Sequence, residues 1–374
     1  MDRSRLSSQD FRIDLWCRRL RRLHPLRPRL SKDLIDIRQL SKEQISSFFQ
    51  QNGLPEYRGS QIYEWIWRKG VTDFNMMTNL SIELRSLLIN KFIIKNSKLV
   101  SFQKSKDGTI KNKIKLYDGN YIESVLIPSN NRTTACVSSQ VGCSLDCKFC
   151  ATSKLKRMRN LNFDEIFDQI VLINEQSLKV YNKPLSNIVF MGMGEPLMNY
   201  NNVIKSIKKI TSTDGLAISP KRITLSTSGI PKMIKKISEE YPKINLALSL
   251  HSAIENTRNK IMPFTSNFPL SELLDSVKYW FEKTKRLVTY EYIIWKNIND
   301  KDVDIEALIN FCKKSPCKVN LINYNAIGDS KFNNADNVII KKYVEHLKKN
   351  NISVTIRKSR GHDIDAACGQ LAFK

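Results

Sequence analysis

At 374 residues, the chain can hold one large domain with a smaller attachment, or two medium domains, and its 41% hydrophobic residues suffice for a core. The formal net charge of +25 exceeds what solubility requires and favours a polyanionic partner, with nucleic acid ahead of an anionic membrane surface. No apolar run approaches the roughly 18 residues of a spanning helix, and eight cysteines, three of them clustered, favour a reducing, cytoplasmic setting over a disulfide-stabilised scaffold.

Residues 1–32 differ in composition from the rest of the chain. They hold ten Arg and Lys against three acidic residues, with scattered Leu and Pro and no apolar segment of the kind that defines a secretory signal. An RNA-binding arm, an organelle transit peptide and an over-extended start are alternatives. We favour a disordered basic extension without an essential role.

Residues 33–96 are expected to form a small helical domain. Ser41 followed by Gln44 has the pattern of a capping box and predicts the start of a first helix. A second helix is expected over 58–69, and Ser81 is expected to cap a third.

Basic and aromatic residues occur together in this helical segment. Exposed Trp or Arg side chains would contact RNA by stacking on bases or by binding phosphates. The alternative, which we favour for at least one of Trp65 and Trp67, is that the side chain fills a small core.

Residues 97–130 alternate polar and apolar positions, with Asp-Gly dipeptides at 107–108 and 118–119 between the alternating runs. Such dipeptides are the strongest short-range hairpin signal, so we expect a three-stranded antiparallel connector. Its last strand places Glu123 on the same face as the apolar Val125. A carboxylate on an apolar face needs a partner or a function, and an edge-strand glutamate with its hydrogen bonds satisfied is the alternative.

Strands and helices alternate over residues 131–374. Strands are expected at 133–138, 187–192, 222–227, 244–250, 288–294, 319–324 and 353–358. Helices are expected at 162–177, 200–210, 231–238, 270–284, 303–312 and 337–348. Repeated strand–helix units with Val-, Ile- and Leu-rich strands predict an α/β fold with a parallel sheet curved into a barrel or partial barrel.

Polar and small residues gather at the C-terminal ends of these strands, where active sites of such folds lie. They are Gly194, Glu195, Ser226, Ser249, Leu250, His251 and Asn325. A turn, a helix cap or a buried core histidine would explain each motif alone. Together they outline a pocket suited to an amino acid joined to a nucleoside. Glu195 would bind an ammonium, Ser226 a carboxylate, and backbone groups near His251 and Asn325 the ribose and adenine.

Cys143, Cys147 and Cys150 form a Cys-x3-Cys-x2-Cys run after the first of these strands. Structural zinc sites and ordinary iron–sulfur clusters take four protein ligands, so three cysteines would leave one iron of a four-iron cluster open to a small molecule. Phe149, beside the last cysteine, would help to exclude water. A zinc site completed by a distant residue and unligated core cysteines are the alternatives; the spacing favours the open cluster.

These motifs resemble those of radical S-adenosylmethionine (SAM) enzymes. More narrowly, about nine-tenths of the chain, from residue 36 to the C-terminus, is similar to the bacterial dual-specificity RNA adenosine C2-methyltransferases. The matching segments are 133–152, which contains the three clustered cysteines, 190–197, 224–229, 248–251 and 366–371. One departure is Ala326, where proline is common in the family.

The resemblance implies a radical SAM partial barrel with a [4Fe-4S] cluster on Cys143, Cys147 and Cys150. It implies two SAM molecules per turnover, bound near the polar residues named above. The implied substrates are adenosines in large-subunit (23S) rRNA and in the tRNA anticodon loop. Flavodoxin or ferredoxin is the kind of electron donor expected, and we expect a monomer.

The resemblance also assigns roles to three residues of the chemistry. Adenine C2 has no available lone pair with which to attack the SAM methyl group, but a carbon radical can add to it. Cys368 would be methylated by one SAM, and a 5′-deoxyadenosyl radical from a second SAM would take hydrogen from that S-methyl group. Glu123 would accept the C2 proton, and Cys136 would attack the sulfur of Cys368, releasing product and forming a disulfide.

Two other functions stay open at this point. One is the same mechanism directed at adenine C8, as in related antibiotic-resistance enzymes. The other is a non-catalytic RNA-binding protein with a structural metal.

Overall fold

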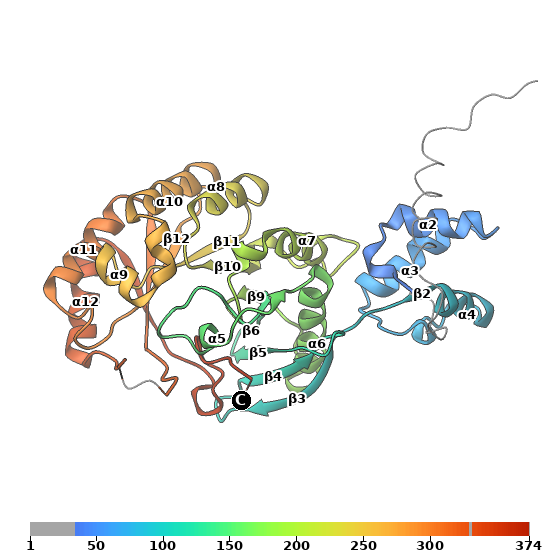
Figure 1. Cartoon of the computed structure of the whole chain (residues 1–374), viewed down its shortest axis with the longest axis horizontal. Helices are drawn as coiled ribbons and strands as arrows, with labels where there is room; N and C mark the ends of the chain where they lie inside the picture. Colours follow the sequence, from blue (N-terminus) through green and yellow to red (C-terminus); the bar gives the residue numbers. More distant parts are fainter. Residues whose placement is uncertain (1–33, 329–330, 374) are drawn as a thin grey trace, which may run out of the picture.

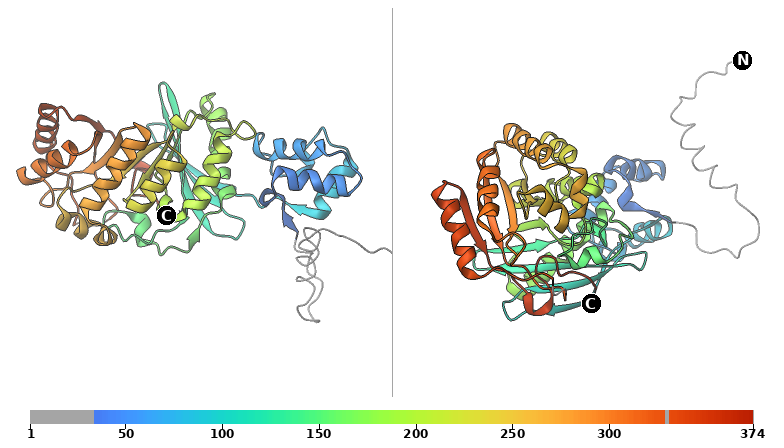
Figure 2. Two further views of the ribbon diagram at one scale, coloured as in Figure 1. Left: turned by 90° about the horizontal axis from the view of Figure 1, so that it is seen from above. Right: turned by 60° about the vertical axis from the view of Figure 1, so that its left-hand side comes forward.

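The computed structural model describes residues 34–328 and 331–373, which form a small N-terminal helical module and a larger α/β body (Figure 1). The module projects from one side of the body (Figure 2). Residues 1–32, expected to be a disordered basic extension, lie outside the described residues. No helix among the described residues is long and apolar enough to span a membrane.

The N-terminal module contains α2 (Lys42–Gln51), α3 (Tyr57–Trp67), α4 (Ile82–Lys91) and the short parallel strands β1 (Ile35–Asp36) and β2 (Phe92–Ile93). The predicted capping box is confirmed, because the Ser41 hydroxyl accepts from the Gln44 N–H and the Gln44 side chain accepts from the Ser41 N–H. Ser81 caps α4 in the predicted way, since its hydroxyl accepts from the N–H of Leu84.

The two tryptophans of α3 have different environments. Trp67 is 1% exposed and packs on Phe163 and Phe167 of α6 (Phe163–Tyr181), so it fills the core between the module and the body. Trp65 is only partly buried, and the Lys69 ammonium lies 3.5 Å from its ring centroid. The expectation that at least one of them fills a core is therefore confirmed.

Within the described residues, the body is built on one ten-stranded sheet of order β14-β13-β12-β11-β10-β9-β6-β5-β4-β3. Its strands are β3 (Lys98–Lys104), β4 (Ile110–Lys115), β5 (Tyr121–Ser129), β6 (Arg132–Cys136), β9 (Asn187–Phe190), β10 (Ile223–Thr227), β11 (Asn245–Ser249), β12 (Val288–Ile293), β13 (Cys317–Ile322) and β14 (Ser353–Arg357). β3 to β6 pair antiparallel, and β6 and β9 to β14 pair in parallel. The antiparallel connector and the seven parallel strands are thereby confirmed.

Helices cover the outside of this curved sheet (Figures 1 and 2). Besides α6 they are α7 (Tyr200–Thr211), α8 (Pro231–Glu240), α10 (Leu270–Thr284), α11 (Asp302–Lys313) and α12 (Asn337–Lys349). The short α5 (Ala151–Lys154) and α9 (Glu255–Ile261), not expected from the sequence, lie in loops at the ends of strands. They are too short to show a full amphipathic period.

The barrel is partial, because β14 and β3 are the two edges of the sheet. The segment after β14 closes the gap by hydrogen bonds to the β3–β4 turn. The N–H of Gly361 donates to Asp107 (3.0 Å), and the hydroxyl of Ser105 donates to Asp363 (2.5 Å). These contacts confirm the predicted α/β fold with a partial barrel.

A buried ion pair fastens the module to the body. The guanidinium of Arg38, 3% exposed, lies 2.6 Å from Asp168 and 2.8 Å from Asp164, both on α6. Burial raises the pKa of Asp168 to about 6, although Arg38 acts in the opposite direction. Charges this deeply buried are tolerated only when they are paired.

We predict that Arg38→Met lowers the free energy of unfolding by roughly 3–5 kcal/mol, because it leaves three buried carboxylates, those of Asp36, Asp164 and Asp168, without this cation. Urea unfolding followed by tryptophan fluorescence measures the change. Arg68→Met is the control: the Arg68–Glu64 pair is largely exposed (64% and 49%) and should contribute less than about 1 kcal/mol. Equal losses in the two variants would contradict a special role for Arg38.

Candidate active site

The three clustered cysteines lie in the loop between β7 (Gln140–Val141) and α5. They line a cavity of about 150 Å³ together with Gly194, Glu195, Ser226, Ser249, His251 and Asn325. The fold thus brings together residues from five separate loops that the sequence analysis placed at one rim. Leu250, predicted with them, is fully buried in the core beside the cavity, and its carbonyl oxygen accepts from Arg258 Nε (3.1 Å).

The three thiols lie in largely buried, apolar surroundings. Burial raises the pKa of Cys143 to about 11, and it raises the pKa values of Cys147 and Cys150 as well, so the protein alone keeps the three sulfurs protonated. A bound metal reverses this, because a coordinating thiol is deprotonated outright. Apolar side chains surround the loop, among them Leu145, Met262, Ile293 and Trp295.

Within residues 34–328 and 331–373, no three His, Cys, Asp or Glu side chains are grouped as ligands of a metal ion. A [4Fe-4S] cluster has a different requirement, because each cysteine binds a different iron and the sulfurs stand farther apart than around one ion. The donor set fits such a cluster, since Cys143, Cys147 and Cys150 face one cavity from a single loop.

Glu195 is held in the cavity wall by main-chain donors. The Ser228 N–H donates to one carboxylate oxygen (2.8 Å) and the Leu197 N–H to the other (3.1 Å). Burial raises the pKa of this carboxyl, and the Ser228 N–H is the leading influence in the opposite direction. Gly194 precedes it with φ +93°, where a side-chain carbon would lie 2.5 Å from Cβ of Gln140. Only glycine fits this approach.

His251 is a neutral, fixed imidazole. Its Nδ1 accepts from the Ile293 N–H (3.3 Å), and burial lowers its pKa to about 3. Its ring makes an edge contact with Phe149, whose centroid is 4.9 Å away, and lies beside Trp295. The predicted water-excluding position of Phe149 is consistent with these contacts, since the ring lies between the cysteine loop and the barrel wall.

A second and larger cavity, of about 580 Å³, adjoins the first inside the barrel. Cys136, Thr134, Asn320, Thr355 and further polar residues line it. Cys368 lines both cavities, as do Met191, Glu291, Ile322 and Arg357. The structure therefore brings Cys136 and Cys368 to one space, with Cys368 also facing the cavity of the three clustered cysteines.

Cys136 and Cys368 lie in different electrostatic environments. Burial raises the pKa of Cys136 to about 12, and the guanidinium of Arg357 acts in the opposite direction. Cys368 is exposed. Arg357 is partly exposed, with 32% of its side chain accessible, and lies 3.9 Å from Glu291; its pKa is raised, first by Cys368 and also by Cys136. A cation therefore stands where a Cys136 thiolate would form.

The C-terminal tail that carries Cys368 is held through its main chain. The side chain of Asn325 donates to the Cys368 carbonyl (3.2 Å), and the N–H of Ala151 donates to the Gly369 carbonyl (2.7 Å). The Thr152 hydroxyl donates to the Leu371 carbonyl (2.7 Å). These bonds fix the backbone through main-chain atoms, while the thiol of Cys368 lies within the influence of the Arg357 guanidinium.

Glu123 lies on β5 beneath this tail and is 2% exposed. Its carboxylate accepts from the Ala372 N–H (2.8 Å) and lies 3.7 Å from the ammonium of Lys111. Glu123 is not among the residues that line the two cavities. The tail would have to shift for this carboxylate to meet a substrate.

Sequence reasoning missed three charged residues here: Lys111, Glu291 and Arg357. Glu291 was recognisable as a lone carboxylate in an apolar strand, and Arg357 as the end of the seventh strand, at the rim where other polar residues were recognised. Lys111 was harder to find. The turn at 118–119 places Lys113 directly opposite Glu123. Glu123 nevertheless forms its ion pair with Lys111, which lies on the same face of the strand but closer to the interior.

Comparison with known proteins decides the family. Residues 35–94 match the ribosomal RNA large subunit methyltransferase N-terminal domain, and residues 137–309 match the radical SAM superfamily. The chain is 58% identical over 339 residues to the probable dual-specificity RNA methyltransferase RlmN of Christiangramia forsetii, covering 91% of this chain and 96% of the relative. The chain belongs to the RlmN family of dual-specificity RNA methyltransferases.

Other RlmN relatives and a solved structure agree. Identity is 39% over 348 residues to the dual-specificity RNA methyltransferase RlmN of Desulfotalea psychrophila, covering 91% of this chain and 96% of that protein. The crystal structure of a radical SAM methyltransferase from Sphaerobacter thermophilus superposes with a TM-score of 0.85 at 34% identity, covering 90% of this chain and 99% of that one. The protein is thus a radical SAM RNA methyltransferase, which implies a [4Fe-4S] cluster and SAM as cofactors. It is an enzyme and not the non-catalytic RNA-binding protein considered above.

Proposed function

We propose that this enzyme methylates C2 of adenosine in large-subunit (23S) rRNA and in the tRNA anticodon loop, with an S-methyl group on Cys368 as the carrier of the methyl carbon. The observation that carries the proposal is the position of Cys368, which faces the cavity of the clustered cysteines on one side and Cys136 on the other. A thiol in this place can receive a methyl group from SAM and later be attacked by a second thiol.

Cys143, Cys147 and Cys150 are the proposed cluster ligands, and the cluster with SAM would supply the 5′-deoxyadenosyl radical. Glu195 is the proposed partner of the SAM ammonium, and Gly194, Ser226, Ser249, Leu250, His251 and Asn325 complete the proposed SAM site. Of these, all except Leu250 line the smaller cavity. Two SAM molecules serve one turnover, one for methylation of Cys368 and one for the radical.

Glu123 and Cys136 complete the proposed reaction. Once the methylene carbon has joined C2, Glu123 takes the C2 proton and the adduct's unpaired electron would return to the oxidised iron–sulfur cluster, so that a closed-shell adduct remains. The thiolate of Cys136 then attacks Sγ of Cys368, so that an S–S bond forms as the S–CH2 bond breaks. The bond's electron pair passes to the methylene carbon, which takes up a proton and becomes the methyl group. We propose that the enzyme acts as a cytoplasmic monomer reduced by flavodoxin or ferredoxin.

The test of this function is Cys136→Ala incubated anaerobically with RNA, SAM and reductant. We expect a covalent protein–RNA species joined through Cys368, because the attack that releases the product is missing. Denaturing gels and mass spectrometry of the cross-linked peptide detect it. Cys312→Ala, which removes a buried cysteine away from both cavities, is the matched control and should turn over without trapping.

Mass spectrometry of nucleosides from RNA treated with the parent enzyme distinguishes methylation at C2 of adenine from methylation at C8. We expect 2-methyladenosine. A product of 8-methyladenosine would support the C8 alternative, and an adduct-free Cys136→Ala protein would count against the S-methylcysteine route.

We predict that Glu195→Gln weakens SAM binding roughly 10- to 100-fold, because hydrogen bonds to charged groups contribute about 1.5–3 kcal/mol. Calorimetry on the cluster-loaded protein measures the affinity. Glu240→Gln, which alters an exposed carboxylate that accepts from Tyr200, is the control and should bind SAM as the parent does. Parental affinity in Glu195→Gln would exclude Glu195 as the ammonium partner.

Arg357→Met should slow resolution of the covalent adduct. The pKa of Cys136 is about 12, so its thiolate fraction and the resolution rate should rise with pH. Loss of the nearby cation should raise this pKa further, and each added unit should lower the resolution rate about tenfold. Rapid-quench measurement of adduct decay tests this. Arg357→Lys should recover part of the rate, and parental decay in Arg357→Met would refute a role in thiolate stabilisation.

A further inference from the structure

The antiparallel strands β3, β4 and β5 carry side chains in rows that lead out of the barrel. Directly paired residues of adjacent strands project from the same face. The innermost row contains Lys111, Val125 and Cys136, because Val125 pairs with both of the others. The next row contains Lys113 opposite Glu123. The outermost row contains Lys98, Lys115 and Tyr121.

Exposure increases along these rows. Cys136 and Lys111 are buried, Lys113 and Tyr121 are partly exposed, and Lys98 and Lys115 are exposed. One face of the sheet therefore carries side chains from the proposed resolving cysteine out to solvent, with the C-terminal tail lying over Glu123. We call its outer part, made of Lys98, Lys113, Lys115 and Tyr121, the rim face.

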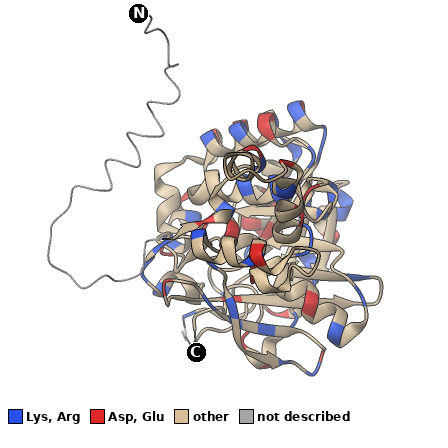
Figure 3. Cartoon of the chain, turned by 90° about the vertical axis from the view of Figure 1, so that its right-hand side faces the viewer, with Lys and Arg blue, Asp and Glu red and all other residues tan. Residues whose placement is uncertain are grey.

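The rim face combines unpaired positive charge with an aromatic ring. No ion pair within residues 34–328 and 331–373 involves Lys98, Lys113 or Lys115, and the nearby Glu123 is paired with Lys111. The ammonium groups of Lys113 and Lys115 lie 5.2 and 6.0 Å from the centroid of the Tyr121 ring. Lys and Arg positions on these strands are visible in Figure 3. Clustered cations beside an aromatic ring suit a single-stranded nucleic acid.

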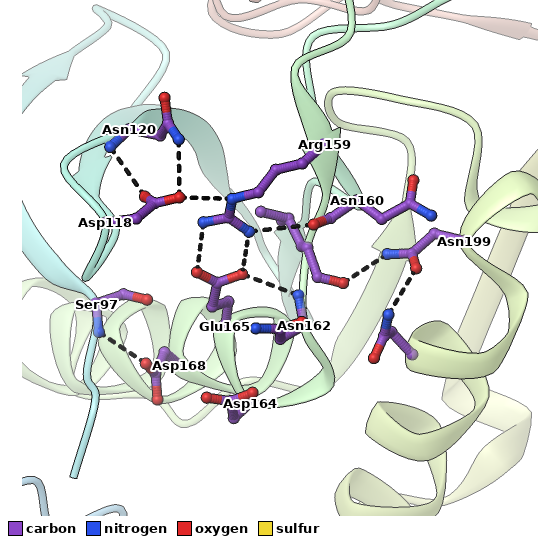
Figure 4. Close-up of polar contacts among 12 residues, drawn as sticks. Ser97, Asp118, Asn120, Arg159, Asn160, Asn162, Asp164, Glu165, Asp168 and Asn199 are labelled. Carbon is purple, nitrogen blue, oxygen red and sulfur yellow. Dashed lines mark hydrogen bonds and ion pairs between the residues drawn. The ribbon is translucent and has the colours of Figure 1, made fainter. Parts of the chain in front are cut away.

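Ion pairs made by Arg159 hold the rim face next to the loop of the clustered cysteines. Arg159 donates to Asp118 in the β4–β5 turn (2.6 Å) and to both carboxylate oxygens of Glu165 (2.7 and 2.8 Å) (Figure 4). The bond from Arg159 lowers the pKa of Asp118 to about 2. The loop before Arg159 has no acidic residue from Cys147 onward and exposes Lys154, Lys156 and Arg157.

We propose that the rim face binds the single-stranded RNA segment next to the adenosine that enters the barrel, with its lysines on phosphates and Tyr121 stacked on a flanking base. This inference rests on the proposed function in that the RNA is the substrate. The positive charge of the rim face complements the negative charge of RNA. The rim face leads to Cys136 and Glu123, and this direction favours RNA over an acidic electron-transfer protein as its partner.

The test measures equilibrium binding of an unmodified tRNA transcript to cluster-loaded enzyme over a salt series. Lys113→Gln/Lys115→Gln should lower the slope of log affinity against log salt by about 1.4, since each phosphate contact on a single strand contributes about 0.7. The matched control is Lys235→Gln/Lys283→Gln. These lysines flank Tyr279 on the outer helices at 5.9 and 5.4 Å, and their removal should leave the slope unchanged.

Tyr121 is tested in the same assay. Tyr121→Ala should weaken binding roughly 5- to 150-fold, the range expected for one lost base stack, while Tyr121→Phe should retain the parental affinity. Tyr279→Ala is the corresponding control. Iron content and melting temperature of each variant establish that it is folded. Lys98→Gln, on the exposed edge strand, provides a variant that cannot disturb the core and should lower the slope by about 0.7.

The proposal would be overturned if the rim-face variants bound RNA with the parental affinity and with the parental slope of log affinity against log salt. Parental RNA binding combined with slower flavodoxin-driven SAM cleavage would assign the face to the electron donor, which also overturns it. The binding measurement needs no turnover. The product could therefore prove to be 8-methyladenosine, and the C2 assignment fail, while the RNA-binding role of the rim face stands.

Discussion

The C-terminal tail crosses the mouth of the barrel on hydrogen bonds made by its main chain, and this places Cys368 between the two cavities. Its carbonyl oxygens accept from Asn325, Ala151 and Thr152, so the backbone is fixed through main-chain atoms. The proposed chemistry requires one sulfur to meet SAM, adenine and Cys136 in turn. Its position next to both cavities suits the contacts with SAM and Cys136, whereas contact of a substrate with Glu123 requires the tail to shift.

Several charged groups in and near the core of the described residues have partners that bear on the proposed chemistry. Glu195 is oriented at the rim by hydrogen bonds from main-chain N–H groups, which stabilise the charged carboxylate that a cationic ligand would pair with. Arg357 balances Glu291 and stands beside the two proposed reactive cysteines. Lys111 pairs with Glu123, while the lysines farther out on the same strand have no acidic partner among the described residues. Desolvation makes an unpaired interior charge costly, which is consistent with the outward position of these lysines.

Much of the architecture followed from local pattern. The seven parallel strands were found because their apolar runs recur between amphipathic helices, and the connector because two Asp-Gly turns divide it. The ends of the strands were predicted less well. Observed strands end up to two residues before the predicted end, because the chain turns away from the sheet there to form the loops of the rim. The environment of Trp67 was not predictable in detail, since its partners Phe163 and Phe167 lie about a hundred residues away.

The sequence by itself determined the three-cysteine spacing, the rim motifs and the presence of Cys136, Glu123 and Cys368, because these depend on residue type and short-range order. Only the tertiary structure decided which groups face one another. The burial of Glu123 under the tail and the position of Arg357 near two thiols join segments far apart in the chain, and the pairing of Glu123 with Lys111 depends on the register of one hairpin. Such contacts depend on strand register and on closure of the barrel, which no local pattern specifies.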